Sequence, residues 1–348
     1  MDAEPNILDY HDGFAEHRHV TSALLYERRS GREVVVTIAI PTFRRLALLK
    51  QALASAAAQH TDVQFEILIV DNDHESDGLE TIEHLRTLDT PDLRYYRNEE
   101  NVGMFGNWNR CLTLAAGEWI TILNDDDLLH PTFLGECLRS IRANSAIQLI
   151  GTGADQLDER QSSTSVSNLR QFMRKLNLAN WKPDVVRQLR SVDYFLNSPH
   201  HGSLGILMLA AQAREIGGYS PLLFPSADLA FLVRYQRRYS AYYRAKRLVT
   251  YRISVNESLK PTVVEGWVAQ GLALRVALMP QIPLPRKLLE LYSRLMAAEV
   301  VLLCKDYFSI NFPIDNLRAR YDLPTGPIYV PFRLLRIVIR TLSMIRRL

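Results

Sequence analysis

Residues 118–127 read EWITILNDDD, an apolar run that ends in three consecutive aspartates. Two earlier stretches have the same form: residues 34–42 read VVVTIAIPT, and residues 65–73 read FEILIVDND. Continuous apolar, β-branched runs of this length are typical of strands that are buried on both faces. Polar residues follow each run at once, so the sequence predicts buried strands whose carboxyl ends carry polar groups.

Helical segments separate these strands. The sequence predicts helices over residues 46–59, 79–88, 102–116 and 132–143, and further strands over residues 93–96 and 147–152. Strands that alternate with helices form parallel βαβ units. We therefore predict an α/β fold with a doubly wound, mostly parallel central sheet and flanking helices. In such sheets ligands bind beyond the carboxyl ends of the strands.

The rest of the chain divides into three regions. Residues 1–33 show no clear period, and we expect an irregular N-terminal extension there. Residues 155–181 are polar and rich in serine, which favours a loop or lid. Residues 263–348 are predicted to form a helical C-terminal extension with proline breaks near residues 280–285. The main domain then spans residues 34–262.

The composition is that of an ordinary globular protein, with 47% hydrophobic and 23% charged residues and a net charge of +3. So small a charge, without a basic stripe that alternates with aromatic residues, indicates no nucleic-acid partner. The three cysteines lie far apart, which argues against a disulfide framework and a thiolate zinc site. The acidic N-terminus is unlike a secretory signal, and no apolar run is long enough to span a membrane. We expect a cytoplasmic protein, either soluble or peripheral on the inner face of the membrane.

The aspartates Asp125, Asp126 and Asp127 have the chemistry of a cation site. Mg²⁺ and Mn²⁺ prefer carboxylate oxygen and keep water and phosphate ligands, so one or two carboxylates suffice. Such an ion neutralises the charge that develops when a nucleoside diphosphate leaves a sugar. The alternative is a solvated acidic turn before the next helix. Three aspartates at the mouth of the sheet favour the functional interpretation.

Five segments carry a resemblance to a known family. In chain order they are PTFRR (41–45), IVDN (69–72), the run from NVGMFGNW to NDDDLLHP (101–131), GGY to LFPSAD (217–228) and YRISVNES (251–258). Over residues 34 to 260 the chain resembles the family 2 glycosyltransferases with the GT-A fold. The resemblance implies a nucleotide-binding half over residues 34–153 and an acceptor half over residues 154–262.

The resemblance also implies roles for individual residues. Asp71 matches the carboxylate that hydrogen-bonds the base of the nucleotide. Asp125 and Asp126 match the ribose and metal carboxylates, with Asp127 as a further metal candidate. Asp228 matches the general base of inverting members. Positions around the donor nucleotide are matched by Pro41, Thr42, Arg44, Asn101, Gly103 and Asn109.

Asp228 has a physical rationale of its own. Inverting transfer needs a carboxylate opposite the leaving group and within hydrogen-bond reach of the acceptor hydroxyl. The alternative is a helix-start carboxylate favoured by the macrodipole, with Ser226 as N-cap. The chain has Asn124, Ala227 and Ser254 where relatives commonly have Asp, Glu and His, which leaves the composition of the metal shell open.

The C-terminal tail, residues 331–348, reads PFRLLRIVIRTLSMIRRL. Its arginines at 333, 336, 340 and 347 fall on one face of a helix. Such a helix either lies in a membrane interface, apolar side down, or packs on the domain with its arginines extended over the surface. The membrane is slightly favoured because no acidic residue balances the arginines.

Together these features predict an inverting, metal-dependent transferase. It would use Mn²⁺ or Mg²⁺ to move a sugar from a nucleoside-diphosphate sugar to a hydroxyl of a glycan or lipid-linked acceptor, in cell-surface polysaccharide synthesis. A processive synthase is disfavoured, since the chain lacks a Q-x-x-R-W pattern and spanning helices. A sugar nucleotidyltransferase and a non-catalytic nucleotide-sugar-binding or scaffold protein stay open as alternatives. The former is expected to carry a Gly-rich basic loop after the first strand, where this chain has PTFRR.

Overall fold

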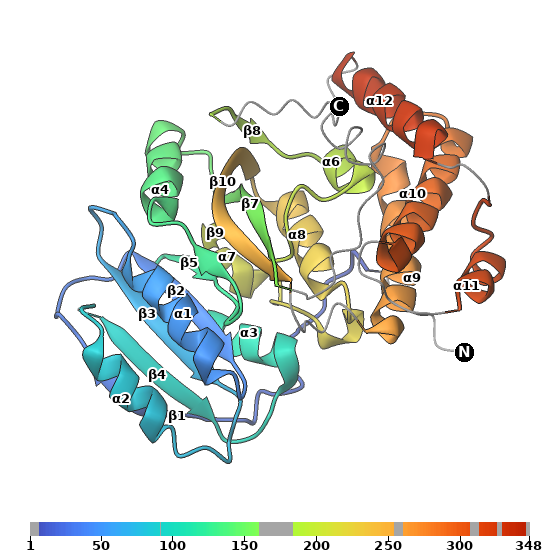
Figure 1. Ribbon diagram of the computed structural model, residues 1–348. Helices are drawn as coiled ribbons and strands as arrows, with labels where there is room; N and C mark the ends of the chain where they lie inside the picture. The colour runs from blue at the N-terminus through green and yellow to red at the C-terminus, as the bar shows by residue number, and fades with distance from the viewer. Residues whose placement is uncertain are drawn as a thin grey trace.

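The computed structural model (Figure 1) describes residues 7–90, 92–159, 184–253, 260–306, 313–325 and 329–345. Within this part of the chain one mixed sheet has the strand order β1-β4-β3-β2-β5-β9-β7-β10-β6, with β8 paired to β10. Helices flank the sheet, and a group of C-terminal helices lies beside it (Figure 1). The α/β fold with a helical C-terminal extension is confirmed.

The first half of the sheet is the predicted parallel unit. β2 (Val36–Thr42) pairs in parallel with β3 (Phe65–Asp71) on one side and with β5 (Trp119–Ile122) on the other. β3 in turn pairs in parallel with β4 (Leu93–Asn98). The carboxyl ends of these strands therefore share one edge of the sheet.

Two hydrophobic cores cover the two faces of this half. Ile38 of β2 belongs to one core together with Leu53, whereas the next residue, Ala39, belongs to the other core together with Trp108. Burial on both faces explains why the strand sequences are apolar without alternation. The helices of this half are α1 (Leu46–Ala57), α2 (Leu79–Thr87), α3 (Gly103–Leu114) and α4 (Phe133–Ala143).

The N-terminal segment is not irregular throughout, so that prediction is wrong for part of it. β1 (Ser22–Arg28) pairs antiparallel with β4 at the edge of the sheet. Most of its residues are partly or fully exposed, and an edge strand of this kind has little apolar pattern to reveal it. Further upstream, Ile7 and Leu8 are buried. The segment thus packs as part of the folded body.

The second half of the sheet is mixed. β7 (Leu149–Asp158) and β10 (Ala241–Ile253) are parallel, whereas β9 (Ile206–Leu209) runs antiparallel to both β5 and β7. β7 continues to Asp158, so the prediction of a loop over residues 155–181 is wrong for residues 155–158, and its residues 160–181 lie outside the described residues. Shorter elements complete this half: β6 (Leu128–Leu129), β8 (Val186–Gln188), α6 (Ser191–Leu196), α7 (Ala210–Glu215), a 3-10 turn (Pro221–Leu223) and α8 (Ala227–Arg238).

The C-terminal region is helical, as predicted. α9 (Pro261–Leu278) packs against α10 (Arg286–Asp306), and a 3-10 turn lies between them near the predicted proline breaks. α12 (Tyr329–Ile345) packs on α10, where the rings of Phe332 and Tyr292 stack with centroids 5.4 Å apart. The remaining helix is α11 (Ile314–Arg320). Among the described helices, none combines the length and the apolar character needed to cross a bilayer.

Candidate functional site

The carboxyl ends of β2, β3 and β5 form the candidate site. Thr42 at the end of β2 is in register with Asp71 at the end of β3. Its Oγ1 donates a hydrogen bond of 2.8 Å to Asp125 Oδ2 in the turn after β5. Pro41 does not interrupt β2, which continues to Thr42. β5 pairs with β2 only as far as Ala39, so the missing N–H of Pro41 removes no bond from that pairing.

The three aspartates are buried but make different contacts. Asp127 Oδ1 accepts the Arg252 backbone N–H at 3.0 Å, and its Oδ2 accepts the Asn124 amide at 3.1 Å. These bonds hold the turn against β10. The carboxylates of Asp125 and Asp126, which are 6% and 8% exposed, face Arg45 instead. Asp126 is therefore a better metal candidate than Asp127, whose two oxygens are both engaged.

Arg45 is a site residue that the sequence interpretation missed. Its Nη1 lies 3.2 Å from Asp126 Oδ2 and 3.6 Å from Asp125 Oδ1. Arg44, the predicted donor contact, has a left-handed φ of 55° and pairs with Asp73 at 3.1 Å and with a neighbouring glutamate. Both arginines precede α1, and the backbone between them decides which one enters the site. The sequence carries no signal for that choice.

Burial sets the acidity of the three carboxyl groups. It raises the pKa of Asp125 to about 6, against the opposing effect of the Thr42 hydrogen bond. Burial and the charge of Asp126 raise the pKa of Asp127 to about 7. Burial also raises the pKa of Asp126, although Arg45 acts in the opposite sense. Raised carboxyl pKa values show that negative charge is costly here, and an added cation would relieve that cost.

The donor set fits a hard divalent cation only in part. Two carboxylates suit Mn²⁺ or Mg²⁺ when phosphate and water supply the other ligands. Within the described ranges, no group of three or more His, Cys, Asp or Glu side chains is arranged to hold a metal ion. Ser254, which stands where relatives have a histidine, lies outside those ranges. An ion held by Asp125 and Asp126 would therefore depend on oxygens from the donor.

Asp71 is fixed at the end of β3. Tyr95 Oη donates a hydrogen bond of 2.8 Å to Asp71 Oδ2, and the Asp73 N–H donates one of 2.9 Å to Asp71 Oδ1. Burial raises the pKa of the Asp71 carboxyl, and the two hydrogen bonds oppose that effect. Tyr95 thus orients the carboxylate that the resemblance assigns to the base of the nucleotide.

The predicted residues Asn101 and Gly103 lie beside this strand end. The Asn72 amide donates to Asn101 Oδ1 at 2.9 Å and to the Gly103 carbonyl at 3.1 Å. Asn98 holds Asn72 in place by donating to its Oδ1 at 2.8 Å. Gly103 has a φ of 70°, and no atom lies within 4 Å of the position that a β-carbon would take. Asn72 and Asn98 are positioning residues, and no local pattern in the sequence separates them from other asparagines.

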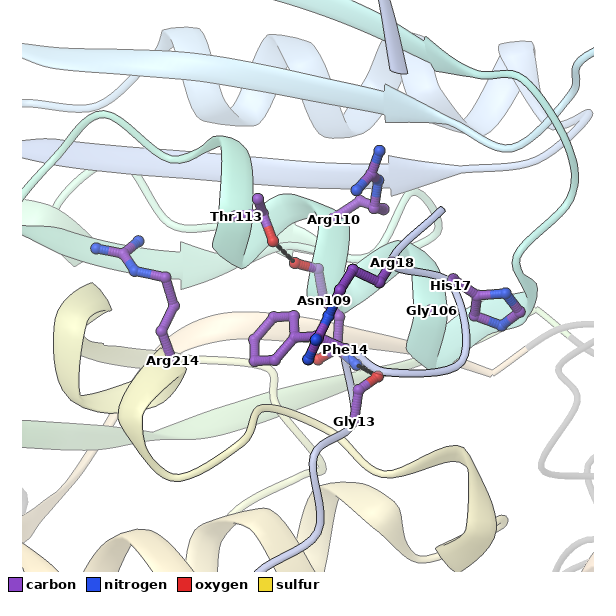
Figure 2. Close-up of a pocket in the computed structure, with 9 residues that line it drawn as sticks. All are labelled: Gly13, Phe14, His17, Arg18, Gly106, Asn109, Arg110, Thr113 and Arg214. Atoms are coloured by element: carbon purple, nitrogen blue, oxygen red, sulfur yellow. Dashed lines mark hydrogen bonds between the residues drawn. The ribbon is translucent and has the colours of Figure 1, made fainter. Parts of the chain in front are cut away.

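Asn109 lies apart from these residues and is engaged by the backbone, and its contact with the donor stays a prediction. Its amide nitrogen donates to the Gly13 and Tyr219 carbonyls, both at 2.7 Å, and its Oδ1 accepts the Tyr219 N–H at 2.8 Å. The side chain is 2% exposed, so it ties the N-terminal segment and the Tyr219 loop to α3. Asn109 also borders a pocket of about 380 Å³ (Figure 2), which none of the other predicted site residues lines.

Asp228 lies in the first turn of α8 and is half-buried. Burial raises its pKa to about 6. Its Oδ1 accepts the N–H of the next residue, Leu229, at 2.7 Å. Ser226 occupies the N-cap position, but its side chain makes no capping hydrogen bond. The alternative interpretation is thus supported by the position of Asp228 in the first turn, but Ser226 does not cap the helix through its side chain.

A chain of contacts connects Asp228 with the aspartates after β5. Gly202 packs directly against Asp228, since a β-carbon on Gly202 would lie 2.9 Å from Asp228 Oδ2. The ring centroid of the preceding residue, His201, lies 6.3 Å from that of Tyr251 on β10. Arg252 follows Tyr251, and its backbone N–H holds Asp127. The structure therefore brings the predicted base and the predicted metal carboxylates into one region.

A parallel βαβ unit with buried carboxylates at its carboxyl edge, continued by a mixed half sheet, defines the GT-A class of glycosyltransferase folds. Residues 37–196 match the sequence model of glycosyl transferase family 2. The match assigns residues 37–196 to glycosyl transferase family 2.

Solved structures share the fold. S. aureus TarS in complex with UDP superposes with a TM-score of 0.54 at 14% identity, covering 82% of this chain and 78% of TarS. The mannosyltransferase PcManGT of Pyrobaculum calidifontis, in complex with GDP-Man and Mn²⁺, has a TM-score of 0.53 at 15% identity, with 91% and 88% covered.

Sequence relatives match over shorter stretches. The GalNAc(5)-diNAcBac-PP-undecaprenol beta-1,3-glucosyltransferase of Campylobacter jejuni is 28% identical over 140 residues, which cover 36% of this chain and 45% of that protein. The first two curated relatives are matched over 62% and 45% of their own lengths. The chain thus spans about half the length of these relatives.

Proposed function

We propose that the protein transfers a sugar, with inversion, from a nucleoside-diphosphate sugar to a hydroxyl of a glycan or lipid-linked acceptor, in cell-surface polysaccharide synthesis. The observation that carries the proposal is the convergence of Asp125 and Asp126 on one point at the carboxyl edge of the sheet. Residues 34–153 would bind the nucleotide, and residues 154–262 would bind the acceptor.

Donor binding would use the strand ends. Asp71, held by Tyr95, can accept a hydrogen bond from the base, and Gly103 leaves open space beside it. Asp125 can accept from the ribose, while Asp126 would hold the divalent cation together with Asp125. That cation, Mn²⁺ or Mg²⁺, supplies neutralisation of the diphosphate charge.

Asp228 would act as the general base. With a pKa of about 6 it is ionised at pH 7, yet it is a stronger base than an ordinary aspartate. It would take the proton of the acceptor hydroxyl while that oxygen bonds to the anomeric carbon. The bond from the anomeric carbon to the diphosphate oxygen breaks in the same step, and the nucleoside diphosphate leaves with the electron pair.

Similar proteins support the donor and acceptor classes. TarS binds UDP, PcManGT binds GDP-Man with Mn²⁺, and the Campylobacter jejuni relative is named for an undecaprenol-linked acceptor. The three cysteines are free and buried, which agrees with a reducing compartment such as the cytoplasm.

Release of nucleoside diphosphate tests the proposal. The protein is incubated with Mn²⁺ and a panel of nucleotide sugars, with Asp126→Ala and Asp228→Ala as site variants. Asp62→Ala is the matched control, because Asp62 is exposed and pairs with Arg142 on the surface. We expect release to fall to background in both site variants and to persist in the control. Release that both site variants retain would contradict the assignment.

Two alternatives have distinct outcomes in the same assay. A scaffold protein would bind no nucleotide by calorimetry, or would bind one without turnover. A nucleotidyltransferase would release inorganic diphosphate from a nucleoside triphosphate in place of nucleoside diphosphate from a nucleotide sugar.

We also propose that α12 rests on an anionic membrane surface. Its outward side chains Leu334, Ile337 and Val338 are 59%, 46% and 44% exposed. Residues 331–348 contain five arginines and no acidic residue, so their positive charge attracts anionic headgroups and disfavours a two-fold dimer. Two of the arginines, Arg336 and Arg340, are partly buried against the body near Tyr292 and Asp193. One side of the helix packs on the body through Phe332 and Ile339, and the opposite side is exposed to solvent. Packing on the domain and contact with a membrane are therefore compatible.

Vesicle co-sedimentation tests the membrane contact. We expect binding to phosphatidylglycerol vesicles and not to phosphatidylcholine vesicles. Ile337→Asp should lower the bound fraction, whereas Leu222→Asp should not, because Leu222 is exposed away from α12 at 71%. Equal binding of the full chain, Ile337→Asp and a 1–330 truncation would rule the contact out.

A further inference from the structure

Arg45 sits where a cation shared by Asp125 and Asp126 would sit. A single atom, Nη1, makes both contacts, at 3.6 Å to Asp125 Oδ1 and 3.2 Å to Asp126 Oδ2. The residue immediately precedes α1, so its backbone is anchored while its side chain reaches into the site. One guanidinium nitrogen therefore bridges the two carboxylates.

The side chains of Asp125, Asp126 and Arg45 differ in their exposure to solvent. The side chains of Asp125 and Asp126 are 8% and 11% exposed, whereas the Arg45 side chain is 37% exposed. The two carboxylates have little access to solvent, whereas the guanidinium has more. A partly exposed ion pair contributes little free energy, so the guanidinium can leave the carboxylates at low cost. The bridge is thus one that can open without disturbing the fold.

The neighbouring Arg252, whose charge also acts to lower the pKa of Asp126, makes different contacts. Arg252 donates from Nε to the Asp126 carbonyl at 2.9 Å, from Nη1 to Glu159 at 2.6 Å and from Nη2 to Gln51 at 2.7 Å. These bonds fix the turn, and its side chain is 5% exposed. The two arginines therefore differ: Arg252 is a fixed support and Arg45 is a displaceable ion.

We propose that Arg45 is a built-in counterion that occupies the cation position in the donor-free protein and is displaced when a divalent ion arrives with a nucleoside diphosphate. The proposal rests on the metal site of the proposed function. A divalent ion held by two carboxylates alone competes weakly against an arginine already in place, whereas diphosphate oxygens add ligands to the ion and can also accept hydrogen bonds from the displaced guanidinium. Metal and nucleotide then bind cooperatively, and the carboxylates are never left without a cation.

Electron paramagnetic resonance of free Mn²⁺ measures this competition without turnover. Titrations use the full chain, Arg45→Met and the matched control Arg142→Met, each with and without UDP or GDP. Without nucleotide, Arg45→Met should bind Mn²⁺ about two- to fivefold more tightly than the native chain, the range expected for one partly exposed ion pair. Arg142→Met should change binding by less than about twofold, since the exposed Arg142 pairs with Asp62 outside the cluster.

Further arms separate the outcomes. Arg45→Lys keeps a cation and should stay close to native Mn²⁺ affinity, and thermal melting confirms that each variant is folded. With nucleotide bound, the difference between native protein and Arg45→Met should shrink. Equal or weaker Mn²⁺ binding by folded Arg45→Met without nucleotide overturns the counterion role. Absence of Mn²⁺ binding in every variant, even with nucleotide, overturns the metal site of the proposed function instead.

Discussion

Replacing Asp228 by asparagine should lower activity and raise stability at the same time. The carboxylate is half-buried and has no arginine or lysine partner in the part of the chain that the structure describes, so its charged form is disfavoured and its pKa rises to about 6. An aspartate in an unfolded chain has a pKa of about 4, and each unit of difference corresponds to about 1.4 kcal/mol. Allowing for partial solvent screening, ionising Asp228 costs the native state about 2 kcal/mol at pH 7.

The sign of the pH dependence follows from that raised pKa. The native protein binds the proton more tightly than the unfolded chain, so the cost is absent below about pH 4 and complete above about pH 6. Asp228→Asn never ionises. It should therefore be about 2 kcal/mol more stable than the native protein at pH 7 and gain nothing at pH 4.

Activity should move the other way. Loss of a general base lowers turnover by about 10²- to 10⁴-fold. In the native protein, protonation of a group with a pKa of about 6 should reduce kcat/KM about tenfold between pH 7 and pH 5.

Urea unfolding at pH 4 and pH 7 and nucleoside diphosphate release give the two readouts. Asp62→Asn serves as the control, and it should lose slight stability and no activity, because Asp62 is exposed and salt-bridged. An Asp228→Asn variant that keeps native turnover, or that is less stable than native at pH 7, would refute the assignment of a buried, unpaired base.

Three further perturbations test other parts of the structure. Thr42→Val removes the hydrogen bond to Asp125 and should weaken binding of the Mn²⁺–nucleotide pair about fivefold by calorimetry, with thermal stability nearly unchanged; unchanged affinity would count against the role of Asp125. Asn109→Leu leaves the Gly13 and Tyr219 backbone groups without partners and should cost about 2 to 3 kcal/mol in urea unfolding while nucleotide affinity persists in the folded fraction. Glu66→Gln weakens a buried pair with Arg94, whose Nη2 lies 2.7 Å from Glu66 Oε1, and should lower the free energy of unfolding by about 3 kcal/mol; a loss under about 1 kcal/mol would show that the pair is not effectively buried.

The parallel half of the fold could be predicted because burial on both faces dictates composition. Residues 36–42 and 65–71 are apolar in the sequence for the reason that both faces of the strands are covered in the structure. Their carboxyl ends had to share an edge, so Thr42, Asp71 and the aspartates after β5 could be grouped in advance. β1 could not be predicted, since an edge strand that is open to solvent needs no apolar period.

The sequence by itself determined the buried strands of the parallel half and the carboxylates at their ends, because these depend on local composition and period. Only the tertiary structure decided which groups contact those carboxylates. Asp127 is engaged by a backbone N–H that lies 125 residues away, and Asn109 is engaged by a carbonyl that lies 96 residues away. Arg45 enters the site and Arg44 leaves it because of one left-handed backbone angle. Such contacts are set by the meeting of distant segments, which no local pattern records.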